Sequence, residues 1–98
     1  MAYAQPPPTR DEVDAWFTAV LTGARTRDEA DRWAAQWHGG PADDAVTDEA
    51  VWWALDLLHG IDLSTGPDGG FLHDDDQMRQ WLDEFRRRCR VLPARDDA

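Results

Sequence analysis

The octamer TRDEVDAW, residues 9–16, returns in the same chain as TRDEADRW, residues 26–33, and this repeat decides the fold. In each copy a Thr precedes a Glu by three residues, as Thr9 precedes Glu12. That spacing is typical of a capping box, in which the Thr side chain accepts the N3 amide hydrogen and the Glu accepts the amide hydrogen of the cap. The repeat therefore predicts two similarly capped helices rather than a duplicated working site.

Apolar residues after each cap recur with helical spacing, as Val13, Trp16, Phe17 and Val20 do after the first. The same reasoning predicts four helices, at 9–23, 26–38, 48–59 and 74–90. We expect an all-α fold, a compact four-helix domain with short loops and at most a minimal β bridge within 60–73. The expected core, with most of the six Trp residues buried, is Trp16, Phe17, Trp33, Trp37, Trp53, Leu57, Trp81, Leu82 and Phe85.

The length of the chain, 98 residues, suits one small domain. We expect a single helical domain over 9–92, between a flexible N-terminal segment, 1–8, and a flexible C-terminal tail, 93–98. The N-terminus has neither a basic start nor an apolar run, and no apolar stretch is long enough to span a membrane. These features predict a cytoplasmic protein with no membrane partner.

Acidic residues outnumber basic ones by 20 to 10, which gives a formal net charge of −10. Such a balance repels phosphate backbones and favours basic partners, so we expect a protein partner and no direct contact with nucleic acid. One basic cluster stands out, formed by Arg86, Arg87, Arg88 and Arg90. Contact with nucleic acid is one interpretation of such a cluster. Because of the negative net charge, we favour the other, in which these arginines suit a helix C-terminus and pair with nearby acidic residues.

No motif for catalysis, cofactor binding or metal binding is present. Ser64 is the only serine and lies outside a nucleophile elbow, and Cys89 is the only cysteine and falls on the apolar face of the last helix. Three histidines form no HExxH pattern, and the stretch from Asp62 to His73 departs from the calcium-loop pattern. We therefore expect no catalytic, cofactor or metal residues, and a protein that is not an enzyme.

The segments TRDEADRWAAQW, residues 26–37, and FLHDDDQMRQWLDEF, residues 71–85, resemble small acidic actinobacterial proteins with the character of bacterial toxin-immunity proteins. The resemblance covers about residues 9–88. It implies an inhibitor that binds one toxin domain, and an acidic face would speed association with a basic toxin.

Trp52, on a helix that is apolar nearly all round, is the aromatic residue most expected to remain uncovered and to anchor such a partner. The acidic residues expected to bind the partner with it are Asp43, Asp44, Asp48, Asp56, Asp74, Asp75 and Asp76. Two alternatives stay open. One is a structural or regulatory homodimer formed through the third helix, and the other is a DNA mimic whose carboxylates imitate phosphates.

Overall fold

The fold consists of four α-helices in the computed structural model, which describes residues 7–38, 46–63 and 73–92. The helices are α1 (Arg10–Thr22), α2 (Arg27–Ala35), α3 (Glu49–Leu58) and α4 (Asp75–Val91). No strand occurs in these three described stretches, which confirms the all-α prediction. Part of the segment predicted to hold a minimal β bridge, 64–72, lies outside them.

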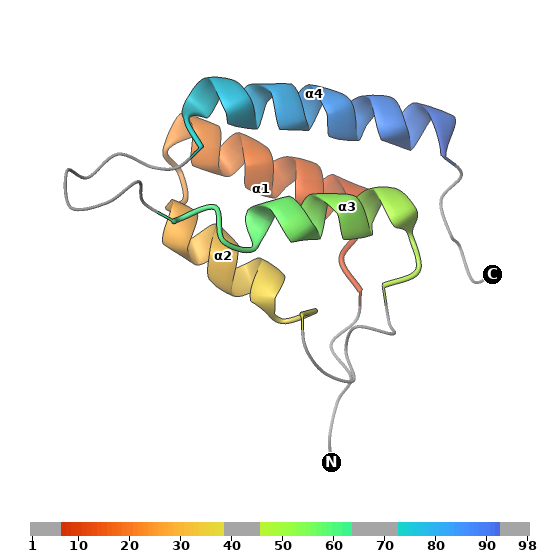
Figure 1. Ribbon diagram of the computed structural model, residues 1–98, viewed down its shortest axis with the longest axis horizontal. Helices are drawn as coiled ribbons and strands as arrows, with labels where there is room; N and C mark the ends of the chain where they lie inside the picture. Colours follow the sequence, from red (N-terminus) through yellow and green to blue (C-terminus); the bar gives the residue numbers. More distant parts are fainter. Residues whose placement is uncertain (1–6, 39–45, 64–72, 93–98) are drawn as a thin grey trace, which may run out of the picture.

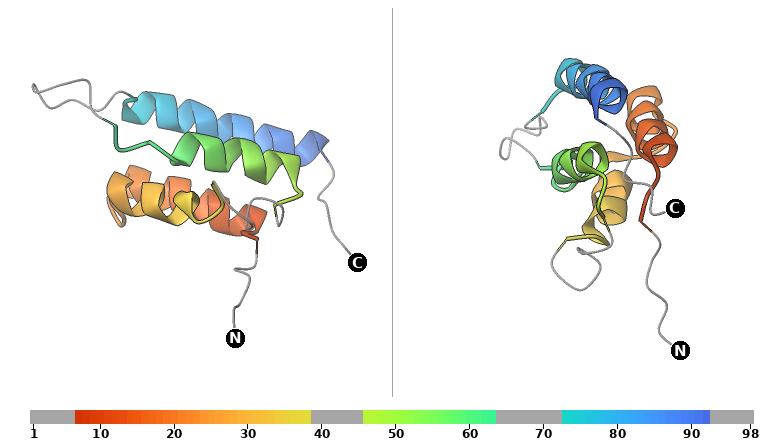
Figure 2. Two further views of the ribbon diagram at one scale, coloured as in Figure 1. Left: turned by 60° about the horizontal axis from the view of Figure 1, so that its bottom comes forward. Right: turned by 90° about the vertical axis from the view of Figure 1, so that its right-hand side faces the viewer.

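The helices form one bundle in which α1 packs against each of the other three. In Figure 1, α4 runs in the direction opposite to α1 and α3, so its C-terminal end lies beside their N-terminal ends. The end-on view in Figure 2 shows α4 and α1 side by side, with α3 and α2 completing the bundle. One end of the bundle thus collects the starts of α1 and α3 and the end of α4.

Both predicted capping boxes are present. Thr9 accepts a hydrogen bond from the amide of Glu12, and the Glu12 side chain accepts one from the amide of Thr9. Thr26 and Glu29 repeat the arrangement at the start of α2. Each box satisfies amide hydrogens that lack partners within the helix, so the local sequence alone fixes where α1 and α2 begin.

The residue after the cap has the same role in both copies of the octamer. The guanidinium of Arg10 donates to the carbonyl oxygens of Cys89 and Leu92 and binds both carboxylate oxygens of Asp48. It therefore joins the start of α1 to the end of α4 and to the cap of α3. The hydrogen bond to Asp48 is the main cause of a raised pKa for Arg10, which stays charged.

Arg27 does the same at the opposite end of the bundle, where it is only 8% exposed. It donates to the carbonyl oxygens of Ile61 and His73, and one of its nitrogens lies 2.9 Å from Asp75 Oδ1. Ile61 follows α3 and His73 precedes α4, so Arg27 fastens both chain segments to the start of α2. One arginine from each repeat thus closes one end of the bundle.

The hydrophobic core differs from the prediction. Phe17, Trp37, Leu82 and Phe85 are buried as expected, but Trp37 is the only fully buried Trp. The expectation that most of the six Trp residues are buried is therefore wrong. The half-buried members of the predicted core that pack against its margin are Trp16, Trp33, Trp53 and Trp81, and Leu57 is half-buried as well.

Small and branched residues occupy the centre instead, because they let the helices approach closely. Alanines from two helices, Ala30, Ala34, Ala50 and Ala54, have no exposed surface. With the space between the helices this narrow, the large indoles lie along the seams and keep one edge in solvent. Trp16 and Trp33, which are equivalent in the two octamers, stack with ring centroids 5.2 Å apart.

Gly23 ends α1 in the left-handed conformation, with φ of 83°. A Cβ atom at this position would meet nothing within 4 Å, so backbone strain is the only cost of a side chain. We expect Gly23→Ala to lower the free energy of unfolding by about 1 kcal/mol in urea denaturation. Gly23→Asn is the control and should lose less, since Asn tolerates this conformation; equal losses would contradict the explanation.

Candidate functional site

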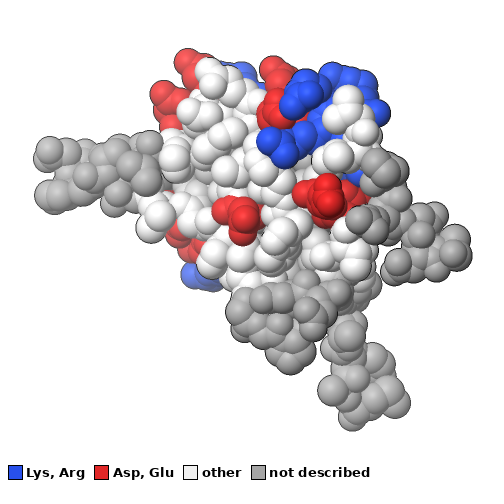
Figure 3. All heavy atoms as spheres, turned by 45° about the vertical axis from the view of Figure 1, so that its right-hand side comes forward, with Lys and Arg blue, Asp and Glu red and all other residues white. Residues whose placement is uncertain are grey.

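Exposed arginines gather on the last two turns of α4. We call Arg86, Arg87, Arg88 and Arg90 the arginine surface; Figure 3 shows a dense group of basic atoms on this face of the molecule, next to acidic ones. α4 presents Met78, Leu82 and Phe85 to the core, which leaves the positions between them to solvent. The amphipathic pattern of α4 therefore turns Arg87 and Arg90 outward, whereas Arg86 lies on the flank beside α1 and Arg88 on the flank beside α3.

Three of these arginines are held by neighbouring carboxylates. Arg86 binds both oxygens of Asp14 on α1, with an Nε to Oδ2 distance of 2.7 Å. Arg87 and Arg88 share Glu84, at 2.6 Å and 2.8 Å. For Arg90, which is exposed, the described part of the chain offers no ion pair.

The partners keep one another charged. The hydrogen bond from Arg86 holds the pKa of Asp14 below its usual value, and the hydrogen bond from Arg87 does the same for the pKa of Glu84. Two carboxylates thus oppose part of the positive charge without removing it. Residues 83–92 contain four arginines and two acidic residues, so this end of α4 carries a local positive excess.

An aromatic side chain borders the arginine surface. The guanidinium carbon of Arg88 lies over the ring of Trp53, 4.3 Å from the centroid of the ring. Trp53 belongs to α3 and is half-buried, and a third of the Arg88 side chain is exposed. A cation over an indole face is attracted to the electrons of the ring, so Trp53 and Glu84 together fix the position of this guanidinium.

The predicted partner-binding residues do not form one surface. Asp48 caps α3 and binds Arg10, at the end of the bundle opposite to Asp74, Asp75 and Asp76, which begin α4. Asp43 and Asp44 lie outside the described residues. Their role, and that of the others, in binding a partner stays a prediction.

Trp52 and Asp56, two of the predicted partner-binding residues, both contact the same histidine, His38. The ring of His38 stacks on Trp52 with centroids 5.0 Å apart, and its Nε2 lies 3.1 Å from Asp56 Oδ1. His38 also stacks on His59, whose Nδ1 lies 3.0 Å from Asp31. Trp52 is consequently half-buried rather than left uncovered, and these contacts join the end of α2 to α3.

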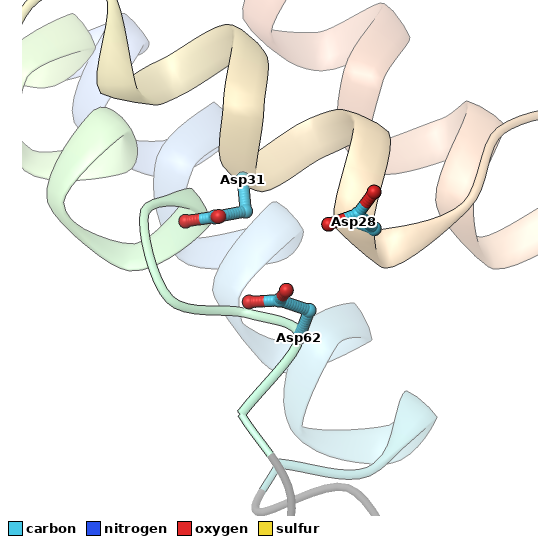
Figure 4. Close-up of side chains that lie close together, drawn as sticks. All are labelled: Asp28, Asp31 and Asp62. Atoms are coloured by element: carbon cyan, nitrogen blue, oxygen red, sulfur yellow. The ribbon is translucent and has the colours of Figure 1, made fainter.

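Three carboxylates, those of Asp28, Asp31 and Asp62, lie close together beside α2 (Figure 4). The sequence pattern did not predict this cluster. One oxygen from each lies within 4.8 Å of the others. Asp31 already accepts hydrogen bonds from His59 and from the amide of Gly60. Exposed acidic groups often lie close together without an ion, so this cluster by itself indicates no metal site.

Cys89 lies on the buried side of α4 and is half-buried. Burial raises the pKa of its thiol. A thiol in this state is a poor nucleophile, as expected from its position in the sequence.

Among the residues that the structure describes, no helix combines the length and the apolar character needed to cross a membrane.

Comparison with known proteins gives one family. A family model described as YxzC DNA-binding protein matches residues 8–85. The chain is also 36% identical, over 67 residues, to the uncharacterized protein YxzC of Bacillus subtilis; the match covers 68% of this chain and 53% of that relative. The chain thus spans about half the length of the relative. No solved structure matches.

These findings correct three predictions. The resemblance to actinobacterial toxin-immunity proteins is wrong, because the match is to another family and to a Bacillus protein. The function inferred from it, toxin inhibition, is wrong for the same reason. The expectation of a protein partner and no nucleic acid is contradicted by the description of the family. The expectation of no nucleic acid rested on the net charge, which sums the whole chain, whereas residues 86–90 concentrate four arginines.

Proposed function

Since the chain belongs to the YxzC family, we propose that it binds DNA and that the arginine surface contacts the backbone phosphates. The observation that carries the proposal is the clustering of four solvent-accessible arginines within the last two turns of one helix. Arginine suits this role because its planar guanidinium presents several donors to the oxygens of a phosphate.

The ion pairs leave donors for a phosphate. Asp14 occupies Nε and Nη2 of Arg86, and Glu84 occupies the same two nitrogens of Arg87. A guanidinium has about five N–H donors, so the Nη1 side of each arginine is still available. Phosphates can therefore bind without breaking the pairs that hold these side chains in place.

The net charge of the chain does not cancel this local attraction. Asp76, near the start of α4, and Arg88 are about 18 Å apart along the helix, from the usual rise per residue. Salt screens exposed charges beyond about 10 Å at moderate ionic strength. The acidic start of α4 therefore weakens the field at the arginine surface only slightly, although binding should be modest and sensitive to salt.

The proposal also bears on whether the protein is an enzyme and on where in the cell it acts. A role in DNA contact makes the protein a binding module rather than an enzyme, in agreement with a sequence that has no catalytic motif. It also favours the predicted cytoplasmic location, since in a bacterium such as the Bacillus relative that compartment holds the DNA.

We expect the double variant Arg87→Ala/Arg90→Ala to bind DNA more weakly than the natural protein. Each lost phosphate contact reduces the slope of log affinity against log salt by about 1, so the slope should fall by about 2. Fluorescence anisotropy with a labelled oligonucleotide over a salt series measures both quantities. Both side chains are exposed, so the fold should be kept.

Arg32→Ala/Arg79→Ala is the matched control, because it removes the same charge from two exposed arginines elsewhere on the surface. It should leave the salt slope unchanged. Equal effects of the two double variants would show that the contact is not at the arginine surface. Absence of DNA binding by the natural protein at low salt would refute the proposal and favour the DNA mimic.

A further inference from the structure

The contact between Arg88 and Trp53 indicates which form of DNA the arginine surface suits. Arg88 differs from its neighbours because it is held from two sides. Its Nε donates to Glu84 Oε2 at 2.8 Å, and its guanidinium carbon lies 4.3 Å from the centroid of the Trp53 ring. The Trp53 ring and Glu84 together hold the plane of the Arg88 guanidinium in a fixed position.

Such a pair is suited to a nucleobase. Unstacked bases are recognised by stacking on aromatic rings and on the planes of guanidinium groups. About a third of the Arg88 side chain is exposed, and Trp53 is half-buried, so both remain in reach of solvent. In a duplex the bases are stacked on one another, and no base face is available for this contact.

The net charge of the chain also favours single-stranded DNA over a duplex. A duplex carries one negative charge per about 1.7 Å of helix axis, twice the density of either strand alone. At low salt, where the acidic residues outside the arginine surface are poorly screened, a net charge of −10 is repelled more strongly by the denser polyanion. Stacking adds affinity that does not depend on charge.

From these observations we infer that the protein binds single-stranded DNA, with one base stacked at Arg88 and Trp53 and the adjoining phosphates at Arg87 and Arg90. The inference rests on the proposed function and narrows it. The remaining arginine of the surface, Arg86, lies on the side of α4 that faces Asp14 on α1 and adds positive charge to the same surface.

Three labelled probes of equal length test the inference: oligothymidylate, an abasic strand with the same number of phosphates, and a duplex. The natural protein should bind oligothymidylate at least about fivefold more tightly than the abasic strand, which is the effect of one stacked base. It should also prefer oligothymidylate to the duplex.

Arg88→Lys keeps the charge and the partner Glu84 but removes the planar group. Its affinity for oligothymidylate should fall about fivefold, whereas its affinity for the abasic strand should not change. Arg79→Lys is the matched control, because Arg79 is an exposed arginine of α4 outside the arginine surface, and it should alter neither. Thermal unfolding by circular dichroism checks that both variants keep the fold.

The possible failures are distinct. Equal affinity for the abasic strand and oligothymidylate, or tighter binding to the duplex, would overturn the stacking inference and leave the proposed DNA contact standing. An equal loss of affinity for both strands in Arg88→Lys would overturn it as well. Binding to none of the three probes would overturn the proposed function together with the inference.

Discussion

Phe17→Ala lowers the free energy of unfolding by about 3–5 kcal/mol in urea denaturation, the usual cost of removing a buried ring. Phe17 has no exposed surface and packs against Phe85 of α4, with ring centroids 6.3 Å apart. It lies on α1, the helix that contacts all three others, so the cavity would open at the centre of the bundle. The loss is a large share of the total stability of about 5–15 kcal/mol typical of a domain.

Thr18→Ala, at the next position of α1, is the control. Thr18 is exposed, and its hydroxyl makes only a long contact of 3.5 Å with Asp14. Its replacement should change the free energy of unfolding by less than about 0.5 kcal/mol. A small loss from Phe17→Ala would mean that the bundle is packed differently from the arrangement described above.

Arg27→Ala lowers the free energy of unfolding by about 2–4 kcal/mol, because it removes charge-assisted hydrogen bonds at a buried site. The carbonyl oxygens of Ile61 and His73 lose their donor, and Asp75 loses its ion pair. Urea denaturation of Arg27→Ala and Arg27→Lys measures the effect. Lysine should restore only part of the loss, since one ammonium group does not reproduce the planar fork.

Arg32→Ala tests the same helix at an exposed position. Arg32 pairs with Asp28 one turn earlier, and its side chain is 77% exposed. Exposed pairs of this kind contribute about 0.3–0.5 kcal/mol. If Arg27→Ala cost no more than Arg32→Ala, the closure of the bundle by Arg27 would be disproved.

The sequence predicted the helix starts because the chemistry there is local. The partners of Thr9 and Thr26 lie three residues along the chain, so the pattern contains the whole interaction. The helix ends were less accurate, and α2 stops at Ala35, before the predicted 38, because its last turn tightens: the amide of Gln36 donates to Trp33, three residues back. Nothing in the sequence pattern distinguishes such a turn from a continuing helix.

Interactions between distant residues were not predictable in the same way. Arg10 donates to carbonyl groups of Cys89 and Leu92, 79 and 82 residues later. Composition identified the cluster at residues 86–90 but favoured charges that suit the helix C-terminus and form ion pairs over contact with nucleic acid, because the net charge of the chain is negative. The contact between Arg88 and Trp53 appears only once α3 and α4 lie side by side.

The stack of Trp16 on Trp33 gives the fold its own optical signal. Two indole rings this close couple their electronic transitions, and the coupling produces a pair of circular dichroism bands of opposite sign. The rings come from α1 and α2, so this contribution depends on the packing of the two helices; a second one comes from Trp33 and Trp37, whose ring centroids are also 5.2 Å apart. Undocking of α2 can then be followed separately from melting, in the natural protein and without an added label.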